Sequence, residues 1–315
     1  MTVADQPCEI VAIGEPMIEF NETSPAQYLQ GFGGDTANFA VAAARQGART
    51  AYYTRLGDDH FGRMLLALWE CEGIDAGSVQ IDVAAHTGIY FVNHGVDGHQ
   101  FHYLRAGSAA SRMQPDMLPA RLIRDAQFLH VSAISQAISA SACATVRHAI
   151  AIARSAGTRV AYDPNLRLRL WPLEQARAEI EATIAHTDVF LPSLDEARTL
   201  AGTESMAGVF DWCASCGARQ VVLKCGVDGA WVWDGAQRIP RHVAPIRVQP
   251  VDATGAGDCF DGALVARLVA GDSLDDAARY ANVAAALSTT GYGAIAPIPD
   301  TATVLMQLTR GLLGA

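Results

Sequence analysis

The fold of this chain is predicted most directly by the stretch Asp252-Ala253-Thr254-Gly255-Ala256-Gly257-Asp258, which runs into Cys259-Phe260-Asp261-Gly262-Ala263-Leu264. A strand-like run, residues 246–251, precedes this stretch, and an apolar pattern at helical spacing follows it as far as Val269. The glycines therefore lie where we expect a strand to turn into a helix.

This kind of junction suits the binding of an anion. Small residues allow a ligand to approach the backbone, and the first N–H groups of a helix have no partner within the helix. Together with the helix dipole, these donors form an anion site. Asp258 adds a carboxylate at its mouth. The pairing is typical of phosphoryl transfer, in which backbone N–H groups hold the moving phosphoryl group and a carboxylate takes the proton of an attacking hydroxyl.

Other interpretations of the glycine-rich stretch fit less well. No Gly-x-x-x-x-Gly-Lys-Ser/Thr loop of the Walker A type occurs in the chain. The stretch also lacks the third glycine of a dinucleotide-binding fingerprint, and it lies near the C-terminus instead of in a first strand–helix–strand unit. One plain alternative stays open, in which the stretch is a flexible turn and Asp258 only caps the helix.

Bulk composition limits the class of protein. The chain has 315 residues, enough for one large α/β domain or two smaller ones, and 50% of them are hydrophobic, so a large core can form. The formal charge of −10 argues against nucleic acid and anionic membranes as partners, and an anionic substrate would need arginines close to it. No stretch is apolar for the length of a membrane span, and residues 1–9 lack the features of a signal peptide. We therefore expect a cytoplasmic protein.

The seven cysteines are scattered along the chain, as expected for reduced thiols. Cys213 and Cys216 form a Cys-x-x-Cys pair, but the sequence offers no second pair to complete a zinc site. We therefore expect both cysteines to lie within a helix and to have no role in metal or redox chemistry.

From residue 116 onward the sequence alternates strand and helix, which indicates a mostly parallel sheet with helices on both faces. We expect strands at residues 9–14, 50–56, 79–83, 128–132, 159–163, 189–192, 220–224, 230–234 and 237–243. We expect helices at residues 35–46, 60–72, 116–125, 139–156, 173–186, 194–201, 207–216, 259–270 and 274–289. No linker or repeat interrupts this order, so residues 1–315 are expected to form a single domain.

Two early segments, about residues 15–32 and 87–105, have β character and do not fit the alternation. In the second segment, strands 87–93 and 99–104 are joined by Gly95-Val96-Asp97-Gly98, a strong hairpin signal. We expect the two segments to form a small β lid over the open edge of the sheet. An exposed strand edge in the lid would favour pairing with a second subunit, so we expect a homodimer or larger homo-oligomer.

Polar segments follow several of the predicted strands. They are Gly33-Gly34-Asp35, residues 163–167, residues 193–196, residues 224–229 and the glycine-rich stretch itself. Ligands of doubly wound sheets bind beyond the carboxyl ends of the strands, which is where these segments would meet. We therefore expect one site to which all five segments contribute.

Lys224 is the only lysine of the chain, and every other basic side chain apart from histidine is arginine. A coding bias toward arginine explains why lysine is rare. Two interpretations of Lys224 stay open: it contacts a phosphate group, or it is a lysine that has remained by chance.

On these residues the chain resembles the ribokinase-like (PfkB) carbohydrate kinases over nearly its whole length. Two motifs carry the resemblance, Gly33-Gly34-Asp35-Thr36-Ala37-Asn38 and the glycine-rich stretch that ends at Asp258. The resemblance implies a three-layer α/β sandwich with a β lid, the use of ATP and Mg²⁺, and a catalytic base at Asp258. It also implies that Gly255, Ala256 and Gly257 form the anion hole for the transferred phosphate.

The resemblance extends to the nucleotide site. The family's Asn-x-x-Glu motif is present as Ser193-Leu194-Asp195-Glu196, which departs from the common form at its first position. Glu196 is expected to act on magnesium through water, and a requirement for a monovalent cation is left open. The nucleotide is expected to contact Asn165, Ser193, Lys224, Gly226, Gly229 and Asn282.

Within the family, the chain looks most like the 2-keto-3-deoxygluconate kinases, through residues 14–16, 90, 103–108, 163–167 and 170–171. By that resemblance, the sugar acid would be contacted by Gly33, Gly34, Asn38, Tyr90, Tyr103, Arg105, Ile134 and Arg167. Arg105 and Arg167 could clamp a carboxylate, because guanidinium matches carboxylate in bidentate geometry. The alternatives are a surface salt bridge for Arg105, a helix-proximal cap for Arg167, and packing within the lid for the two tyrosines.

We therefore predict a transferase that phosphorylates the 6-hydroxyl of 2-keto-3-deoxygluconate with ATP. Its partner would be a small sugar acid, with no nucleic acid or membrane. Three alternatives stay open: a kinase for another sugar such as fructose, tagatose or a deoxy-inositol acid, a nucleoside kinase, and a regulator that binds a sugar without turning it over.

Overall fold

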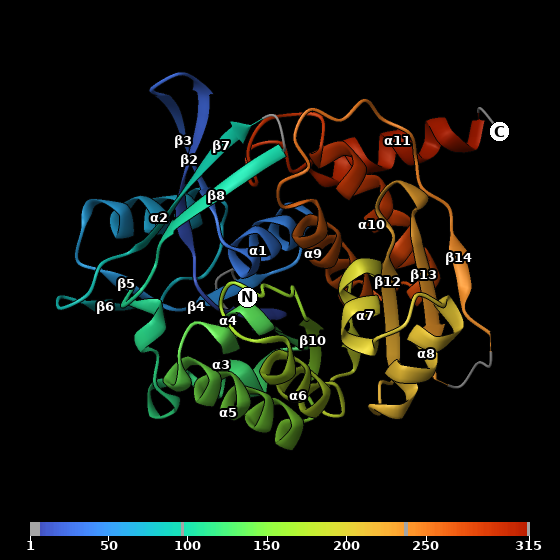
Figure 1. The fold of residues 1–315 in the computed structure, drawn as a ribbon, viewed down its shortest axis with the longest axis horizontal. Coiled ribbons are helices and arrows are strands. Elements are labelled where there is room, and N and C mark those ends of the chain that lie inside the picture. The colour runs from blue at the N-terminus through green and yellow to red at the C-terminus, as the bar shows by residue number, and fades with distance from the viewer. Residues whose placement is uncertain (1–6, 96–97, 236–238, 314–315) are drawn as a thin grey trace.

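The structure, a computed structural model, describes residues 7–95, 98–235 and 239–313. The strands of its main sheet are β1 Ile10–Ile13, β4 Thr50–Tyr53, β9 Phe128–Ser132, β10 Arg159–Asp163, β11 Val189–Phe190, β12 Gln220–Lys224, β13 Ala230–Asp234 and β14 Arg241–Val243. They lie in the order β14-β13-β12-β11-β10-β9-β1-β4 (Figure 1). The strands from β12 to β4 are parallel, and β13 and β14 continue the sheet antiparallel. The expected α/β class with a mostly parallel sheet is confirmed.

Helices cover both faces of this sheet (Figure 1). One face packs against α1 Asp35–Arg45, α2 His60–Cys71, α9 Ala256–Val269, α10 Leu274–Ser288 and α11 Thr301–Leu313. The other packs against α3 Ala120–Asp125, α5 Ala140–Ala156, α6 Leu173–Ile184, α7 Leu194–Ala201 and α8 Met206–Ser215. Strand β1 shows why helices are needed on both faces. Ile10 and Ala12 belong to the hydrophobic core on the α1 side of the sheet, Val11 and Ile13 belong to the core on the α5 side, and all four are fully buried. A strand that is covered on both sides needs an apolar residue at every position.

The expected lid is present as a second sheet of four strands. It consists of β3 Gln27–Gly33, β2 Met17–Ser24, β7 Gly88–Gly95 and β8 Gly98–Leu104, in that order (Figure 1). Met17, Tyr90 and Val92 form a small apolar cluster of its own within the lid. The predicted turn between β7 and β8 includes residues 96 and 97, which lie outside the described residues.

The prediction of a strand at residues 246–251 is wrong. These residues form an irregular segment between β14 and the glycine-rich stretch. Pro245 and Pro250 lack the N–H group that a strand ladder requires, and Val251 is exposed. The glycine-rich stretch therefore connects a loop to α9, and the hydrophobic residues of the run do not become part of the sheet.

Other differences are local. The predicted helix 116–125 is split into a short 3₁₀ turn, Pro115–Met117, and α3, because Pro119 stands immediately before the first residue of α3. The predicted strand 237–243 is described only as β14, since residues 237 and 238 lie outside the described residues. Sequence analysis placed residues 15–32 in the lid without dividing them into β2 and β3. It missed α4 Ala133–Ala137, α11, and the pairing of β5 Arg55–Gly57 with β6 Gln80–Asp82.

The cysteine pair lies as expected, with Cys213 buried in α8 and Cys216 at the end of that helix. In the described part of the chain, every helix falls short of the length and apolar character needed to cross a membrane.

Candidate active site

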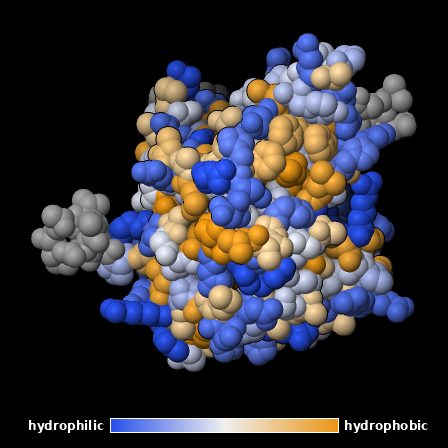
Figure 2. Space-filling model, turned by 90° about the vertical axis from the view of Figure 1, so that its left-hand side faces the viewer, coloured by the Kyte–Doolittle hydropathy of each residue, from blue (hydrophilic) through white to orange (hydrophobic). Residues whose placement is uncertain are grey.

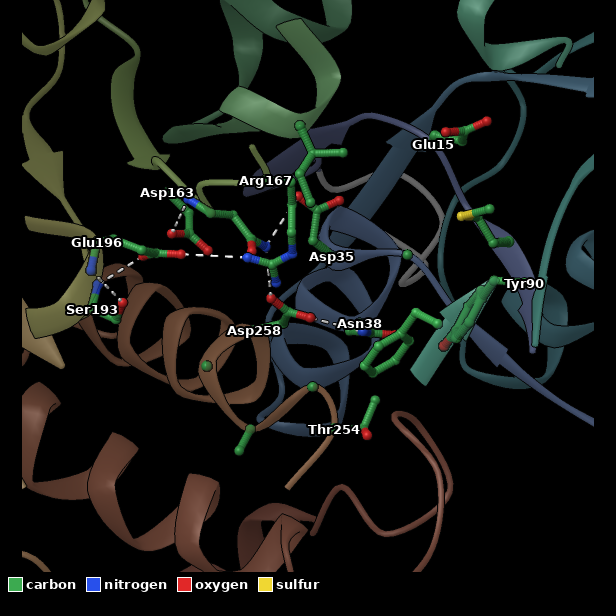
Figure 3. Close-up of a pocket in the computed structure, with 18 of the residues that line it drawn as sticks. Glu15, Asp35, Asn38, Tyr90, Asp163, Arg167, Ser193, Glu196, Thr254 and Asp258 are labelled. Carbon is green, nitrogen blue, oxygen red and sulfur yellow. Dashed lines mark hydrogen bonds and ion pairs between the residues drawn. The ribbon is translucent and has the colours of Figure 1, made fainter. Parts of the chain in front are cut away.

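A cavity of about 610 Å³ lies between the lid and the carboxyl ends of the parallel strands (Figure 3). All five polar segments that the sequence places at this edge line it. Their lining residues are Gly34, Asp35, Asp163, Asn165, Arg167, Ser193, Glu196, Lys224, Gly226 and residues 253–258. Met17, Tyr90, Phe101 and Tyr103 of the lid close the other side. Segments separated by more than 200 residues thus share one site.

The glycine-rich stretch forms the floor of this cavity. Gly255 precedes α9 with φ of 74°, and a side chain there would lie 3.0 Å from the Ala294 carbonyl oxygen, so glycine is required by both the turn and its neighbour. Gly257 is different, because an added Cβ would meet only Lys224 Nζ, at 3.7 Å. Of the three N–H groups predicted for the anion hole, that of Ala256 already has a partner, because it donates to Ala253 O at 3.2 Å. The Lys224 ammonium group lies beside Gly257 at the N-terminus of α9, and two positive ends close together are what an anion site requires.

Asp258 is held by two amide groups from other elements. Asn38 Nδ2 donates to its Oδ2 at 2.8 Å, and Asn165 Nδ2 donates to its Oδ1 at 3.4 Å. Figure 3 shows Asp258 at the start of α9 pointing toward Asn38 of α1. Asn165 has φ of 28°, a conformation that is uncommon for a residue other than glycine. The two amides fix the orientation of the Asp258 carboxylate in the lining of the cavity.

Carboxylates crowd around Asp258. Burial, together with the charges of Asp35 and Asp163, raises the pKa of Asp258 to about 8. Burial also raises the pKa of Asp35. Figure 3 shows these three side chains around one central space. A carboxylate with a raised pKa is a stronger base, which suits the removal of a proton from an alcohol.

Glu196 is anchored at the start of α7. It forms a capping box with Ser193, because Ser193 Oγ accepts from the Glu196 N–H at 3.4 Å and Glu196 Oε2 accepts from the Ser193 N–H at 3.0 Å. Its Oε1 accepts from the Leu166 N–H at 2.9 Å. Both oxygens are thus occupied by protein donors, which fits an indirect role toward Mg²⁺ through water. Serine fills the first position of the motif as the helix cap.

Tyr90, Tyr103 and Arg105, three of the predicted sugar-binding residues, lie on the lid side of the cavity, and Arg167 lies in the loop after β10. Arg105 forms an ion pair with Glu15, whose side chain is 1% exposed, and Ser108 donates to the same carboxylate. This salt bridge is buried against the cavity, which excludes the alternative of a surface bridge for Arg105. Arg167 Nη1 lies 3.5 Å from Glu196 Oε1, and about half of the Arg167 side chain is exposed.

Aromatic side chains of the lid lie close to Arg105. The Arg105 guanidinium lies 5.5 Å from the centre of the Tyr103 ring, and the ring centres of Tyr90 and Tyr103 are 5.7 Å apart. Tyr90 Oη donates to Glu19 at 2.5 Å, so its hydroxyl already has a partner. Ile134 is 9% exposed and lines the cavity from α4.

Three of the predicted site residues lie outside the lining. Gly33 packs against Tyr90, since an added Cβ would meet its hydroxyl at 2.1 Å. Gly229 turns with φ of 84° beneath the Val243 carbonyl. Asn282 Nδ2 donates to Val243 O and Ala244 O at 3.1 and 3.2 Å, which holds β14 against α10. Their contacts with a ligand stay predictions.

Sequence reasoning did not assign several lining residues, among them Glu15, Asp35, Asp163, Arg169 and Thr254. Asp35 and Asp163 stand inside the motifs already singled out, so their position at a strand end was the available signal. Arg169 had no such signal, because it lies in an irregular loop and reaches the lid through Nη1, which donates to Phe101 O at 3.1 Å.

Known proteins agree with this geometry. Residues 8–301 match the pfkB family carbohydrate kinase model. The chain is 35% identical to fructokinase-1 of Zea mays over 322 residues, covering 96% of this chain and 98% of that relative. It is 35% identical to the 2-dehydro-3-deoxygluconokinase of Thermoproteus tenax over 280 residues, covering 85% and 84%. The crystal structure of Vibrio cholerae O395 fructokinase with fructose, ADP and calcium superposes with a TM-score of 0.87 at 29% identity, covering 95% of this chain and 98% of that chain. The chain therefore belongs to the pfkB family of carbohydrate kinases, with the ribokinase-like fold of that family.

Proposed function

We propose that this kinase transfers the γ-phosphoryl group of ATP to the 6-hydroxyl of 2-keto-3-deoxygluconate, the compound also named 2-dehydro-3-deoxygluconate. The observation that carries the proposal is the presence of Arg105, Arg167 and Arg169 in the lining of the cavity that contains Asp258. Burial raises the pKa of Tyr103, and the charges of all three arginines act against this rise, so all three lie near Tyr103. A carboxylate on the substrate is the group that such a cluster binds best.

The reaction follows from the placement of the base and the anion site. Asp258 accepts the proton of the attacking hydroxyl, the sugar oxygen bonds to phosphorus, and the bond to the leaving ADP oxygen breaks. The N-terminus of α9 and Lys224 offset the negative charge on the transferring group. Asn38 and Asn165 keep the Asp258 carboxylate directed at the acceptor.

The donor set fits the nucleotide and its metal. Ser193, Lys224 and Gly226 line the cavity, and Figure 3 shows Ser193 on the side away from Tyr90 of the lid. We assign the nucleotide to this side. Glu196 and neighbouring carboxylates would hold Mg²⁺ through water, because hydrated Mg²⁺ prefers oxygen ligands. When bound, the metal neutralises charge on the phosphate oxygens.

A fructokinase activity is the second candidate. The curated relatives and the superposed structure include fructokinases, and one of them carries fructose and ADP. Within this site, Glu15 neutralises much of the charge on Arg105, which lowers the demand for an acidic substrate. Fructose therefore competes with the sugar acid as the natural acceptor, whereas a nucleoside gains nothing from the three arginines.

A substrate panel tests the proposal. Release of ADP by the purified protein would be measured with 2-keto-3-deoxygluconate, 2-keto-3-deoxygalactonate, fructose, tagatose, a deoxy-inositol acid and a nucleoside. We expect the highest kcat/KM with a keto-deoxy sugar acid. A higher kcat/KM with fructose would replace the sugar-acid assignment with fructokinase, and binding of sugars without ADP release would indicate a regulator.

We also propose that the chain acts as a single domain in the cytoplasm and as a homo-oligomer. The face that carries the lid, turned to the viewer in Figure 2, shows hydrophobic patches among hydrophilic residues. The edge strands of the lid expose Tyr28 and Leu29 on β3 and Leu104 on β8. Exposed edges with apolar side chains favour pairing between subunits. Light scattering coupled to gel filtration would give the mass, and a monomer at micromolar concentration would contradict the oligomer.

A further inference from the structure

The only lysine of the chain occupies a special position in the site. Lys224 ends β12, its side chain is 11% exposed, and it lines the cavity. Its Nζ is the nearest atom to the open space in front of Gly257, 3.7 Å from where a Cβ would stand. An ammonium group at this point lies beside the N-terminus of α9, so both positive ends face the same volume.

Two buried aspartates hold that ammonium group. Lys224 Nζ donates to Asp261 Oδ2 at 2.7 Å and lies 3.5 Å from Asp163 Oδ2. Burial opposes the charged form of Lys224, but Asp163, Asp261 and Glu196 outweigh it and raise the pKa of the amine. Lysine in this site is therefore a permanent cation.

Among the residues that the structure describes, Asp261 forms its one hydrogen bond through the side chain with Lys224. It follows Asp258 by three residues on α9, so both carboxylates lie on one face of the helix. Its side chain is 1% exposed, and among the described residues its Oδ1 has no hydrogen-bond partner. A buried aspartate is costly unless it is paired, so the contact with the ammonium group offsets the cost of burying Asp261 at this position.

We propose that Asp261 is a positioning residue that holds the Lys224 ammonium group beside Gly257, where Lys224 binds the transferring phosphoryl group. This inference rests on the kinase activity but not on the identity of the sugar. The inference explains why the only lysine of the chain stands at position 224. It also gives Asp261 a role in positioning Lys224, whereas Asp258 accepts the proton. The competing explanation is that Lys224 only neutralises buried carboxylates.

A single lysine permits a direct test by NMR. Protein labelled with ¹⁵N-lysine has one side-chain ammonium signal, and it would be titrated with Mg²⁺ and either ADP or β,γ-methylene ATP. We expect the Nζ signal to move with β,γ-methylene ATP and much less with ADP, because only the former has a γ-phosphate. Equal responses to both nucleotides, or no response to either, would overturn the contact. This arm needs only wild-type protein and no acceptor sugar, so failure of the sugar-acid assignment leaves it intact.

Kinetics test the role of Asp261. Asp261→Asn should lower kcat roughly tenfold or more, with a small change in KM for the sugar, measured with whichever acceptor the panel identifies. Asp261→Asn added to Lys224→Met should cause no further loss, since the two residues act as one unit. Asp272→Asn is the matched control, because it removes an aspartate that pairs with Arg267 at the far end of α9. A lower melting temperature with unchanged kcat for Asp261→Asn, or additive losses in the double variant, would show a purely structural role.

Discussion

Asn38 Nδ2 donates a 2.8 Å hydrogen bond to Asp258 Oδ2, although the two residues are 220 positions apart in the chain. Asn38 lies in the first turn of α1 and Asp258 in the first turn of α9, and these two helices pack side by side. The contact joins the two motifs that identify the family. It also orients the group on which the proposed reaction depends.

The first prediction concerns the catalytic base. Asp258→Asn keeps the shape of the side chain but cannot accept a proton, so turnover should fall on the order of 10²- to 10⁴-fold. The fold and ATP binding should persist, because the hydrogen bond from Asn38 can be made to an amide oxygen. Circular dichroism and ATP titration would check both, and turnover above a tenth of the wild-type value would show that another group is the base.

The pH dependence of the reaction follows from the raised pKa of Asp258. The base must be ionised, so kcat/KM should rise about tenfold per pH unit and reach a plateau near pH 8. Asp35→Asn removes a neighbouring negative charge, so the plateau should begin at a lower pH in this variant. Profiles of kcat/KM from pH 5 to 10 would measure this shift, and an unchanged profile in Asp35→Asn would assign the titration to a different group.

The raised pKa of Asp258 also predicts that the stability of the folded protein falls as the pH rises, whereas kcat/KM increases. A carboxyl group whose pKa is raised in the folded protein contributes stability below its unfolded pKa of about 4 and loses it as the pH rises to about 8. Asp258→Asn has no charge to bury, so its melting temperature relative to wild type should increase from pH 5 to pH 9. A constant difference across that range would contradict the buried ionisation.

Two glycines of the site should respond differently to alanine. Gly257→Ala places a methyl group 3.7 Å from Lys224 Nζ, an ordinary contact, so stability should change by less than about 1 kcal/mol while turnover falls at least roughly tenfold. Gly34→Ala requires φ of 98° and puts Cβ 2.3 Å from Glu15 O, which should cost roughly 2 kcal/mol or more of unfolding free energy. Denaturant unfolding and turnover would be compared, and full activity of Gly257→Ala would remove it from the anion site.

The arginine cluster predicts selective effects on substrate binding. Arg167→Ala should raise KM for an acidic sugar roughly 10- to 100-fold, since it removes a hydrogen bond between charged groups. Its effect on fructose should be small. Arg121→Ala, on the exposed side of α3, is the matched control because that side chain is 94% exposed and is not among the residues that line the cavity. Equal changes in KM for acidic and neutral sugars would eliminate the carboxylate clamp.

The sequence predicted the repeating order of strands and helices because each strand of the parallel sheet must be apolar on both faces. It failed at residues 246–251, where an apolar alternation looks like a strand but Pro245 and Pro250 withhold the donors of a ladder. It also missed α11, whose residues pack only at the edge of the core, with Val304 buried and Leu305 and Met306 exposed. Local pattern is therefore informative where burial is complete and weak where it is partial.

The sequence by itself determined the class of chemistry, because the glycine-rich turn, the aspartate that follows it and the strand-end motifs are local features with local causes. Only the tertiary structure decided which charges meet. It paired Arg105 with Glu15, and it set Lys224 between Asp261 and the helix N-terminus. Such contacts depend on the crossing of elements that are distant in the chain, and their electrostatic consequences depend on burial, which no spacing of residues encodes.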